Sequence, residues 1–475
     1  MKRRFRIALS LLLFTIVGLG LTSCMTYYQK TQKFQEAIST GNISEAQKIL
    51  RKQASDSTGK NRILYLFNGG WLNYLSGNSS QAISYLNAAD NYIDDYSKNY
   101  GTEALSLLTN ANVKPYMPED PEKVMVNYYK ALSYLEQNNK SAALVEARKI
   151  NIKLYEFNSK YKGKRNRYSD DPFAHLLMGL IYEADNNVND AFIAYRNAIN
   201  AYDSVFTPRF NIPIPETLKQ DVIRMARANG FTDEEIRFKS RFNMQDPPRL
   251  SKGEGEVVFI WENGFGPVKD QWSINFNVLK GQGGFVNFQS SELGINFPFF
   301  IGDMNPKESA SFSDLKFVRV AFPKYLIRPT VFTQASIEAN NQRIQLNKAQ
   351  NLSDVLVQTL KDRMLREMAN SLLRLATKQA LEEAVRSQNK DIGAAVGILN
   401  ALTEQADTRN WQTLPSEIWY NRISLPAGEQ SLKFKTTGKF GEKTHEIKVT
   451  VKPGELTFIT FRSFEAGPPI PAVAQ

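Results

Sequence analysis

The chain of 475 residues contains only one cysteine and two histidines, and this scarcity excludes several kinds of site. One cysteine cannot form an internal disulfide, and it cannot supply a zinc or iron–sulfur site that needs several thiolates. The two histidines, His175 and His445, are 270 positions apart and fall in different predicted domains. Each is therefore expected to be a packing or surface residue rather than a metal ligand or a catalytic base.

Long apolar runs are also missing after the first 24 residues. A helix that spans a membrane needs about 20 apolar residues, so no later segment is expected to cross one. What is present is 42% hydrophobic and 23% charged residues, a composition that forms packed cores. The length predicts two or three domains.

The first residues have the pattern of a bacterial lipoprotein signal. Residues 2–6 contain four cations, residues 7–21 form an uncharged apolar run, and the run ends in Leu21-Thr22-Ser23-Cys24. This pattern predicts a signal peptide over residues 1–23, cleavage between Ser23 and Cys24, and lipid attached to the Cys24 thiol. Several acyl chains on Cys24 would hold the protein at a membrane, because each buried methylene contributes about 0.8 kcal/mol.

Residues after Cys24 predict where the anchored protein lies. Met25 stands where an Asp would signal retention in the inner membrane, which favours the outer membrane. Residues 26–30 lack an acidic stretch for export to the cell surface, which favours a periplasm-facing position. Removing the four cations of residues 1–23 lowers the formal charge from +11 to +7. A basic body is attracted to anionic lipid or to peptidoglycan, whereas nucleic acid is a poor candidate in this compartment.

A recurring pattern of small residues predicts helical repeats between residues 27 and 226. A Gly or Asn is followed five residues later by Ala at Gly41/Ala46, Gly77/Ala82, Asn138/Ala143 and Asn186/Ala191. In a tetratricopeptide-like repeat the first residue ends one helix, and the Ala allows the second helix to pack closely. Gly179 and Tyr182 fit the same scheme in the last unit. A generic antiparallel helical bundle is the alternative; a repeat array would offer a groove to other envelope proteins.

One basic loop lies between two of these predicted repeats. It contains the cations Lys160, Lys162, Lys164, Arg165 and Arg167, followed by two aspartates. We regard it as a candidate anion-contact loop for phosphate-bearing lipid or a partner. The alternative is a solvated loop between repeats.

The second half of the chain changes from helical to strand patterns. Pro and Gly punctuate residues 243–255, which we interpret as a linker after a repeat domain of residues 24–242. Alternating strands follow over residues 256–465 and predict an antiparallel sheet or sandwich, with a helical insertion at 351–405. That insertion reads as a long helix near 353–386 and a shorter one near 392–405, either a hairpin covering the sheet or a projecting arm. Residues 466–475 are rich in proline and predicted to be disordered.

The fold class predicted from these patterns is therefore α+β with several domains. Its N-terminal part is an all-α, tetratricopeptide-like repeat array. Its C-terminal part is an antiparallel β-sheet or sandwich with a long helical-hairpin insertion.

Several short strings together resemble a known family. They are Glu262-Asn263-Gly264 with Pro267-Val268-Lys269, Ala321 to Tyr325, Ala406 to Trp411 with Thr413-Leu414-Pro415, Leu425 to Gly428, Glu146-Ala147-Arg148 and Gly179 to Ala184. In these the chain resembles bacterial tetratricopeptide-repeat lipoproteins, over most of its mature length. Relatives are sometimes encoded beside lipoprotein activators of penicillin-binding proteins, which implies a role in envelope maintenance. The resemblance supplies no catalytic residues.

Within these strings, Asp407, Arg409 and Trp411 have two interpretations. Arg409 can pair with Asp407, and Trp411 can anchor the insertion against the sheet. Alternatively the three residues form a candidate patch for a partner.

No catalytic motif is found along the chain. The patterns of zinc proteases, serine hydrolases and phosphate-binding loops are missing, and nothing indicates a cofactor or a metal. We therefore expect a non-enzymatic, membrane-anchored scaffold that binds proteins in the cell envelope, possible processes being cell-wall synthesis and complex assembly. The alternative is a module that binds or hydrolyses peptidoglycan or polysaccharide through the C-terminal β domain.

Overall fold

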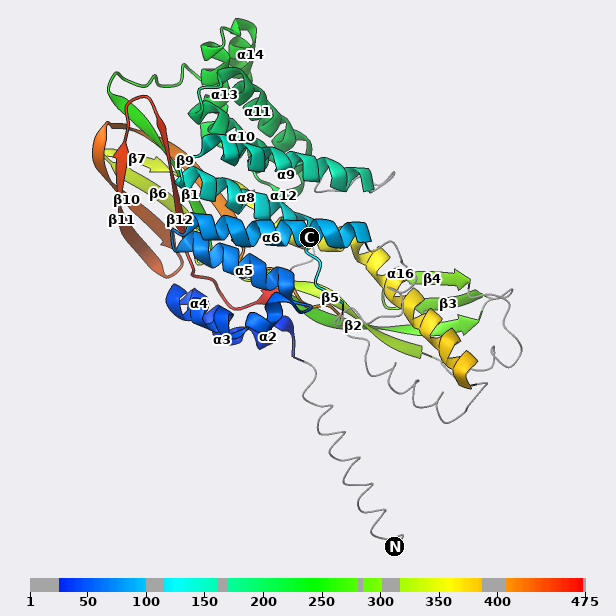
Figure 1. Cartoon of the computed structure of the whole chain (residues 1–475). Coiled ribbons are helices and arrows are strands. Elements are labelled where there is room, and N and C mark those ends of the chain that lie inside the picture. The colour runs from blue at the N-terminus through cyan, green and yellow to red at the C-terminus, as the bar shows by residue number, and fades with distance from the viewer. Residues whose placement is uncertain are drawn as a thin grey trace.

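The fold is α+β, with helical hairpins in the first half of the chain and three sheets with one long helix in the second (Figure 1). A computed structural model describes residues 25–99, 114–160, 170–280, 285–300, 317–386 and 406–472. Cys24 and the predicted signal peptide lie outside these residues, as do the second predicted insertion helix and most of the basic loop.

Helices in the first half pair into antiparallel hairpins. The bounds are α2 Tyr27–Lys30, α3 Gln32–Ser39, α4 Ile43–Lys52, α5 Arg62–Leu75, α6 Ser79–Asn99, α8 Asp120–Glu136, α9 Lys140–Lys160, α10 Pro172–Ala184, α11 Val188–Ala201, α12 Thr207–Phe210, α13 Glu216–Ala228 and α14 Thr232–Phe242. Among the described residues the hairpins are α3/α4, α5/α6, α8/α9, α10/α11 and α13/α14. The first four are the predicted repeats. The fifth lacks the Ala five residues after its turn, so the sequence pattern indicated only a short helical stretch there.

Left-handed residues end the first helix of each hairpin. Gly41, Gly77, Asn138, Asn186 and Gly230 have φ between 57° and 73°. In each case the next residue's amide reaches back five positions to a helical carbonyl, as from Asn187 N to Tyr182 O at 2.9 Å. This closure satisfies carbonyls that the helix end would leave unpaired. The turn is therefore determined locally, within about six residues.

Small residues then allow the paired helices to approach. Ala46, Ala82, Ala143 and Ala191 are fully buried. A Cβ added at Gly70 would lie 2.6 Å from Leu86 Cγ, and one at Gly179 would overlap the ring of Tyr195. The backbone of one helix thus lies directly against side chains of the next.

Thirteen strands are described in the second half, in three sheets. Their bounds are β1 Glu254–Asn263, β2 Val268–Lys280, β3 Phe285–Ser290, β4 Ile295–Phe300, β5 Phe317–Ile327, β6 Phe332–Ala339, β7 Gln342–Gln345, β8 Asn347–Asn351, β9 Glu417–Pro426, β10 Gly428–Gly438, β11 Gly441–Val451, β12 Leu456–Arg462 and β13 Ile470–Pro471. The strand orders are β12-β1-β9-β8, β11-β10-β6-β7 and β13-β5-β2-β3-β4. All described pairs are antiparallel except β1 with β12, which is parallel.

The first two sheets form a sandwich. Phe259 and Trp261 of β1 pack against Phe434 of β10, with ring centroids 4.8 and 5.7 Å apart. Alternate residues of these strands therefore fill a core between the sheets.

The third sheet and the long helix α16 (Leu352–Arg386) form an arm that projects from the body (Figure 1). The inner face of the sheet, including Ile274 and Phe276, packs on Met368 and Leu372 of α16. We call β2–β5 with α16 the arm. Sequence patterns predict strands at residues 272–278 and 317–321, which fall within β2 and β5, but they do not predict β3 and β4 between these two.

The C-terminal tail differs from its predicted disorder over residues 466–472. Gly467 N donates to Pro329 O at 2.7 Å, and Ile470 and Pro471 pair with β5. An extended, proline-rich backbone can still pair at a sheet edge, because its carbonyls remain acceptors.

Candidate functional site

The inner face of the helical repeats, where a repeat protein would bind a partner, contacts the chain's own C-terminal part. The first helix of every hairpin takes part. The contacts, in chain order, are Gln35 with Gln412, Phe67 with Trp411, Glu122 with the Trp411 amide, Glu183 with Arg422, and Thr217 with Asn421. This groove is therefore occupied within the molecule.

The segment from Ala406 to Ser416 fills the middle of the groove. The Trp411 ring is 1% exposed and stacks on Phe67 at 4.3 Å between centroids, with Tyr129 at 5.8 Å. Its backbone amide donates to Glu122 Oε1 at 2.6 Å. One hydrophobic core consequently runs from the repeats into the β part without interruption.

The candidate patch of Asp407, Arg409 and Trp411 is thus an internal contact and not an exposed surface for a partner. Arg409 Nη2 pairs with Asp407 Oδ2 at 2.7 Å and donates to the carbonyl of Lys114 at 3.0 Å, and Nη1 donates to the carbonyl of Lys60 at 3.2 Å. The guanidinium ties the segment to loops before α5 and α8. Hydrogen bonds to main-chain carbonyls fix position and leave no donor aimed outward.

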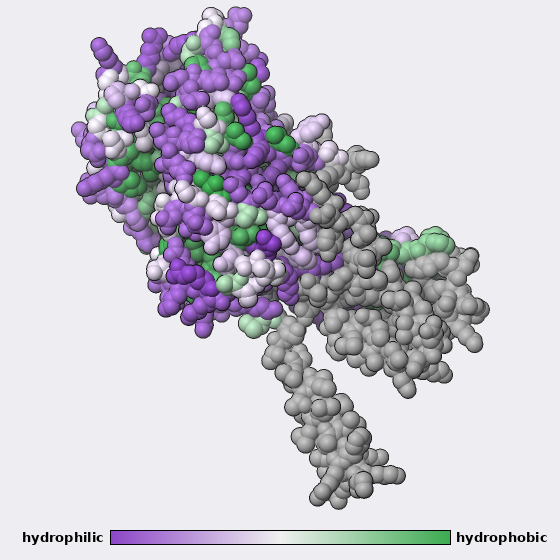
Figure 2. All heavy atoms as spheres, viewed as in Figure 1, coloured by the Kyte–Doolittle hydropathy of each residue, from purple (hydrophilic) through white to green (hydrophobic). Residues whose placement is uncertain are grey.

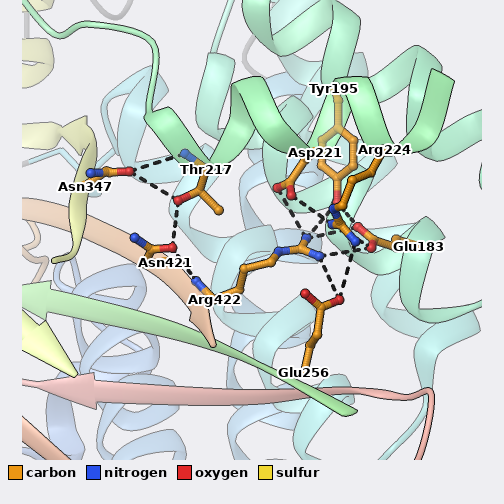
Figure 3. A network of polar contacts seen from close by, with 9 residues as sticks. All are labelled: Glu183, Tyr195, Thr217, Asp221, Arg224, Glu256, Asn347, Asn421 and Arg422. Carbon is orange, nitrogen blue, oxygen red and sulfur yellow. Dashed lines mark hydrogen bonds and ion pairs between the residues drawn. The ribbon is translucent and has the colours of Figure 1, made fainter. Parts of the chain in front are cut away.

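A second contact between the two parts is a cluster of buried charges, which we call the arginine cluster (Figure 3). Arg422 of β9 reaches Glu183 of α10 at 3.0 Å and Glu256 of β1 at 3.2 Å. Arg224 of α13 binds Glu183 and the neighbouring Asp221, both at 2.9 Å. Four elements from both halves therefore meet around two guanidinium groups.

The arginine cluster contains three carboxylates for two arginines, and their pKa values differ accordingly. Burial acts to raise the pKa of Glu183, but Arg422 and Arg224 outweigh it and lower the pKa to about 2. For Asp221 burial is the stronger effect and raises the pKa to about 6, against the attraction of both arginines. Of Glu183 and Asp221, Asp221 is therefore the carboxyl that takes up a proton more readily.

A third contact joins the repeats to the arm through Glu119, just before α8. Its carboxylate forms ion pairs with Lys269 of β2 and Arg363 of α16. Burial acts to raise the pKa of Glu119, yet the two cations lower it to about 2. Beside it, burial raises the pKa of Glu122, whose carboxylate also accepts from Tyr116. The base of the arm is therefore tied to the body by charge.

Arg328 is unusual because it forms no ion pair with a carboxylate of the residues that the structure describes. Its side chain is buried and donates to Gln35 Oε1 at 3.1 Å, Gly266 O at 2.8 Å and Gln412 O. Burial lowers its pKa to about 9. It borders a hollow of about 240 Å³ beside α2 and α3, but three carbonyl acceptors account for its position.

The polar groups that could do chemistry have structural partners. His175 Nε2 lies 2.8 Å from Asp170, and His445 packs on Phe461 with centroids 4.8 Å apart. Among the described residues no group of three His, Cys, Asp or Glu side chains could hold a metal ion. Across those same residues, no helix is both long and apolar enough to cross a membrane.

The sequence analysis located the packing residues but missed the charges that join the halves. Gly179, Tyr182 and the repeat alanines lie inside the hairpins as described above. Glu183, Glu262 and Lys269 stood within the strings quoted for the family resemblance, yet no role was assigned to them. The available signal was a charge inside an apolar strand, as with Arg422 before Ile423.

Comparison with known proteins adds little. No protein family model matches the chain, and no curated protein matches it. Among solved structures, MamA is 15% identical, with 46% of this chain and 92% of that chain covered and a TM-score of 0.27. The putative kinesin light chain TPR-like repeats of Podospora anserina are 13% identical, with 46% of this chain and 95% of that chain covered and a TM-score of 0.31. BtubC from P. vanneervenii is 10% identical, with 53% of this chain and 92% of that chain covered and a TM-score of 0.30. TM-scores below 0.5 establish neither a shared fold nor a shared function.

Proposed function

We propose that this protein is a non-enzymatic scaffold, anchored by lipid on Cys24 to the periplasmic face of the outer membrane, that binds other proteins of the bacterial envelope. The sequence around Cys24 supports the anchor. The resemblance to tetratricopeptide-repeat lipoproteins supports a place in cell-wall synthesis or in the assembly of an envelope complex.

The observation that carries the proposal is the interlocking of the two halves. Buried ion pairs and the Trp411 contact join repeats, sandwich and arm into one body. The charged clusters that might otherwise suggest catalysis hold elements together. A rigid body with a projecting arm suits a protein that positions partners.

The folded body begins close to the proposed anchor. Helix α2 starts at Tyr27, three positions after Cys24, and the Tyr27 amide donates to Thr408 Oγ1 at 3.0 Å. So short a connection would hold the body against the membrane.

Because the inner groove is filled, the partner is expected on the outer helices. Helix α9 carries an apolar stripe of Val145, Ile152 and Tyr155, spaced so that all three lie on one helix face. Tyr155 is 77% exposed. Exposed apolar side chains grouped on one helix face are typical of a protein contact.

Site-specific photo-crosslinking tests this proposal. A photoreactive amino acid at Tyr155 in the lipidated protein, in its own cells, should give a discrete crosslink to one envelope protein. The same photoreactive amino acid at Phe440, a position 81% exposed in the β10–β11 turn, should give no such crosslink. Ile152→Asp should abolish the crosslink. Absence of a crosslink at Tyr155, or the same product from Phe440, would contradict the scaffold.

A separate experiment tests the anchor. Labelled palmitate should be incorporated into the wild-type protein and not into Cys24→Ser. The variant should fractionate with soluble periplasmic proteins instead of membranes. Equal labelling of both proteins would remove Cys24 from the proposal.

A further inference from the structure

One face of the arm sheet is left uncovered by α16. Along β2, β3 and β4 the side chains alternate: Ile274, Phe276, Val286 and Phe288 point toward α16, and the residues between them point away. We call the outward residues of these strands the amide face. They include Asn275, Asn277, Asn287, Gln289 and Asn296.

The amides of this face form a row across the strands. Asn277 pairs with Gln289, and Gln289 pairs with Asn296, so three amides lie side by side on neighbouring strands. Adjacent strands are about 4.8 Å apart, which places one amide per strand spacing. None of the five amides has a hydrogen-bond partner within the described part of the chain. Each one offers both donors and acceptors to a ligand.

Two aromatic rings lie on the same face, four positions along β3 and β4 from Gln289 and Asn296. Phe285 and Phe300 are opposite each other on β3 and β4, with centroids 5.3 Å apart and planes tilted by 56°. They are 44% and 62% exposed. Figure 2 shows green atoms at the place of β4, beyond a body surface that is mainly hydrophilic. Exposed phenyl rings on the same face as amides that lack a hydrogen-bond partner favour a ligand with both hydroxyl groups and apolar ring faces.

Charge identifies the class of ligand. The chain contains 59 Lys and Arg and 48 Asp and Glu, yet no charged side chain lies in the row of amides across β2, β3 and β4. The charged residue Arg319 lies on the neighbouring strand β5, opposite Asn275. An anionic lipid or an acidic peptide would be bound by cations instead. Pro298 in the edge strand β4 lacks an N–H, which disfavours addition of a peptide strand there.

We propose that the amide face, with Phe285 and Phe300, binds an uncharged glycan chain. The amides hydrogen-bond to sugar hydroxyls, and the phenyl rings stack on the apolar faces of the sugar rings. This function is additional to protein binding through α9, and it lies at the far end of the arm from the contacts with the body.

Binding of uncharged hexasaccharides tests the proposal. Chitohexaose, cellohexaose and maltohexaose are titrated into the whole mature protein by calorimetry. At least one probe should bind, with little change between about 50 and about 500 mM salt, because no ion pair is involved.

Two variants and one control locate the site. Phe285→Ala with Phe300→Ala should weaken binding roughly tenfold or more, and Asn277→Ala with Gln289→Ala and Asn296→Ala should do the same. Phe440→Ala, which removes a more exposed phenylalanine on the sandwich, should bind as the wild type does. Circular dichroism melts should match the wild type, because every substituted side chain is partly or fully exposed.

Three results would overturn the proposal. They are no binding of any of the three hexasaccharides, unchanged affinity in both variants, and binding that disappears as salt rises. None of them bears on the Tyr155 crosslink, so failure of the glycan site and failure of the scaffold remain distinguishable.

Discussion

At the scale of single residues, a few buried charges decide how the two halves of the chain adhere. Arg422 lies among carboxylates from α10, α13 and β1, where water screens the charges poorly. Removing one partner from such a group leaves an uncompensated charge, which costs more than the pair itself contributes. The arrangement therefore favours one docking geometry over others.

Asp221 predicts a specific dependence of stability on pH. Its folded pKa of about 6 lies above the ordinary value of 3.8, so its protonated form favours the folded state. That contribution is fully present below about pH 4 and is lost as pH rises through 6. Asp221→Asn cannot titrate, so it should not show this loss of stability with rising pH. Its urea midpoint should therefore fall less between pH 4 and 7 than that of the wild type. Asp95→Asn, an exposed control, should follow the wild type; identical profiles for Asp221→Asn would contradict the prediction.

Trp411 predicts a large loss of stability on truncation. Its ring is buried between Phe67 and Tyr129, so Trp411→Ala should leave a cavity and lower the free energy of unfolding by about 3–5 kcal/mol. Urea denaturation followed by circular dichroism measures the change. Phe440→Ala should change it by less than about 0.5 kcal/mol, because that ring is exposed. A small change in the free energy of unfolding for Trp411→Ala would mean that the contact in the groove contributes little to stability.

At the scale of elements, local signals determine the hairpins. The left-handed Gly or Asn and the buried Ala after it lie within a few residues of the turn they create. Apolar residues recur at every fourth position in α16, and this pattern likewise predicts the length of the helix from the sequence. Strands β3 and β4 were harder to predict, because their alternation is short and amides occupy the outward positions.

Gly77 provides a test of this local control. At φ of 73° a side chain is strained, although nothing lies within 4 Å of an added Cβ. Gly77→Ala should therefore destabilise the protein by about 1 kcal/mol through the backbone alone, and Gly77→Asn by less. Thermal unfolding of both variants measures the difference. An equal loss in the two would indicate a cause other than the left-handed conformation.

At the scale of the whole molecule, one hydrophobic core spans the repeats and the strands β1, β8 and β9, so the repeats and the β part should unfold together. Coincident transitions are expected for helix content by circular dichroism and for tryptophan fluorescence, to which Trp261 and Trp419 of the sandwich contribute.

Arg422→Met tests the coupling of the halves. It leaves three buried carboxylates with one arginine and should cost about 3–5 kcal/mol at neutral pH. Both spectroscopic transitions should move together to lower urea. Loss of one transition while the other stays in place would show that the halves fold independently.

The sequence by itself determined the features that depend on neighbours in the chain: the hairpin turns at Gly41 to Asn186, the helix α16, and the alternating strands β9 to β12. Only the tertiary structure decided that the repeat groove receives Trp411 and that Arg422 meets Glu183, contacts across 344 and 239 positions. The physical reason is range. A turn or an amphipathic stripe is specified within about ten residues, whereas the filling of a groove depends on surfaces that exist only after each half has formed. One cysteine and two histidines could exclude several chemistries, but they could not reveal that the expected binding groove is occupied by the chain itself.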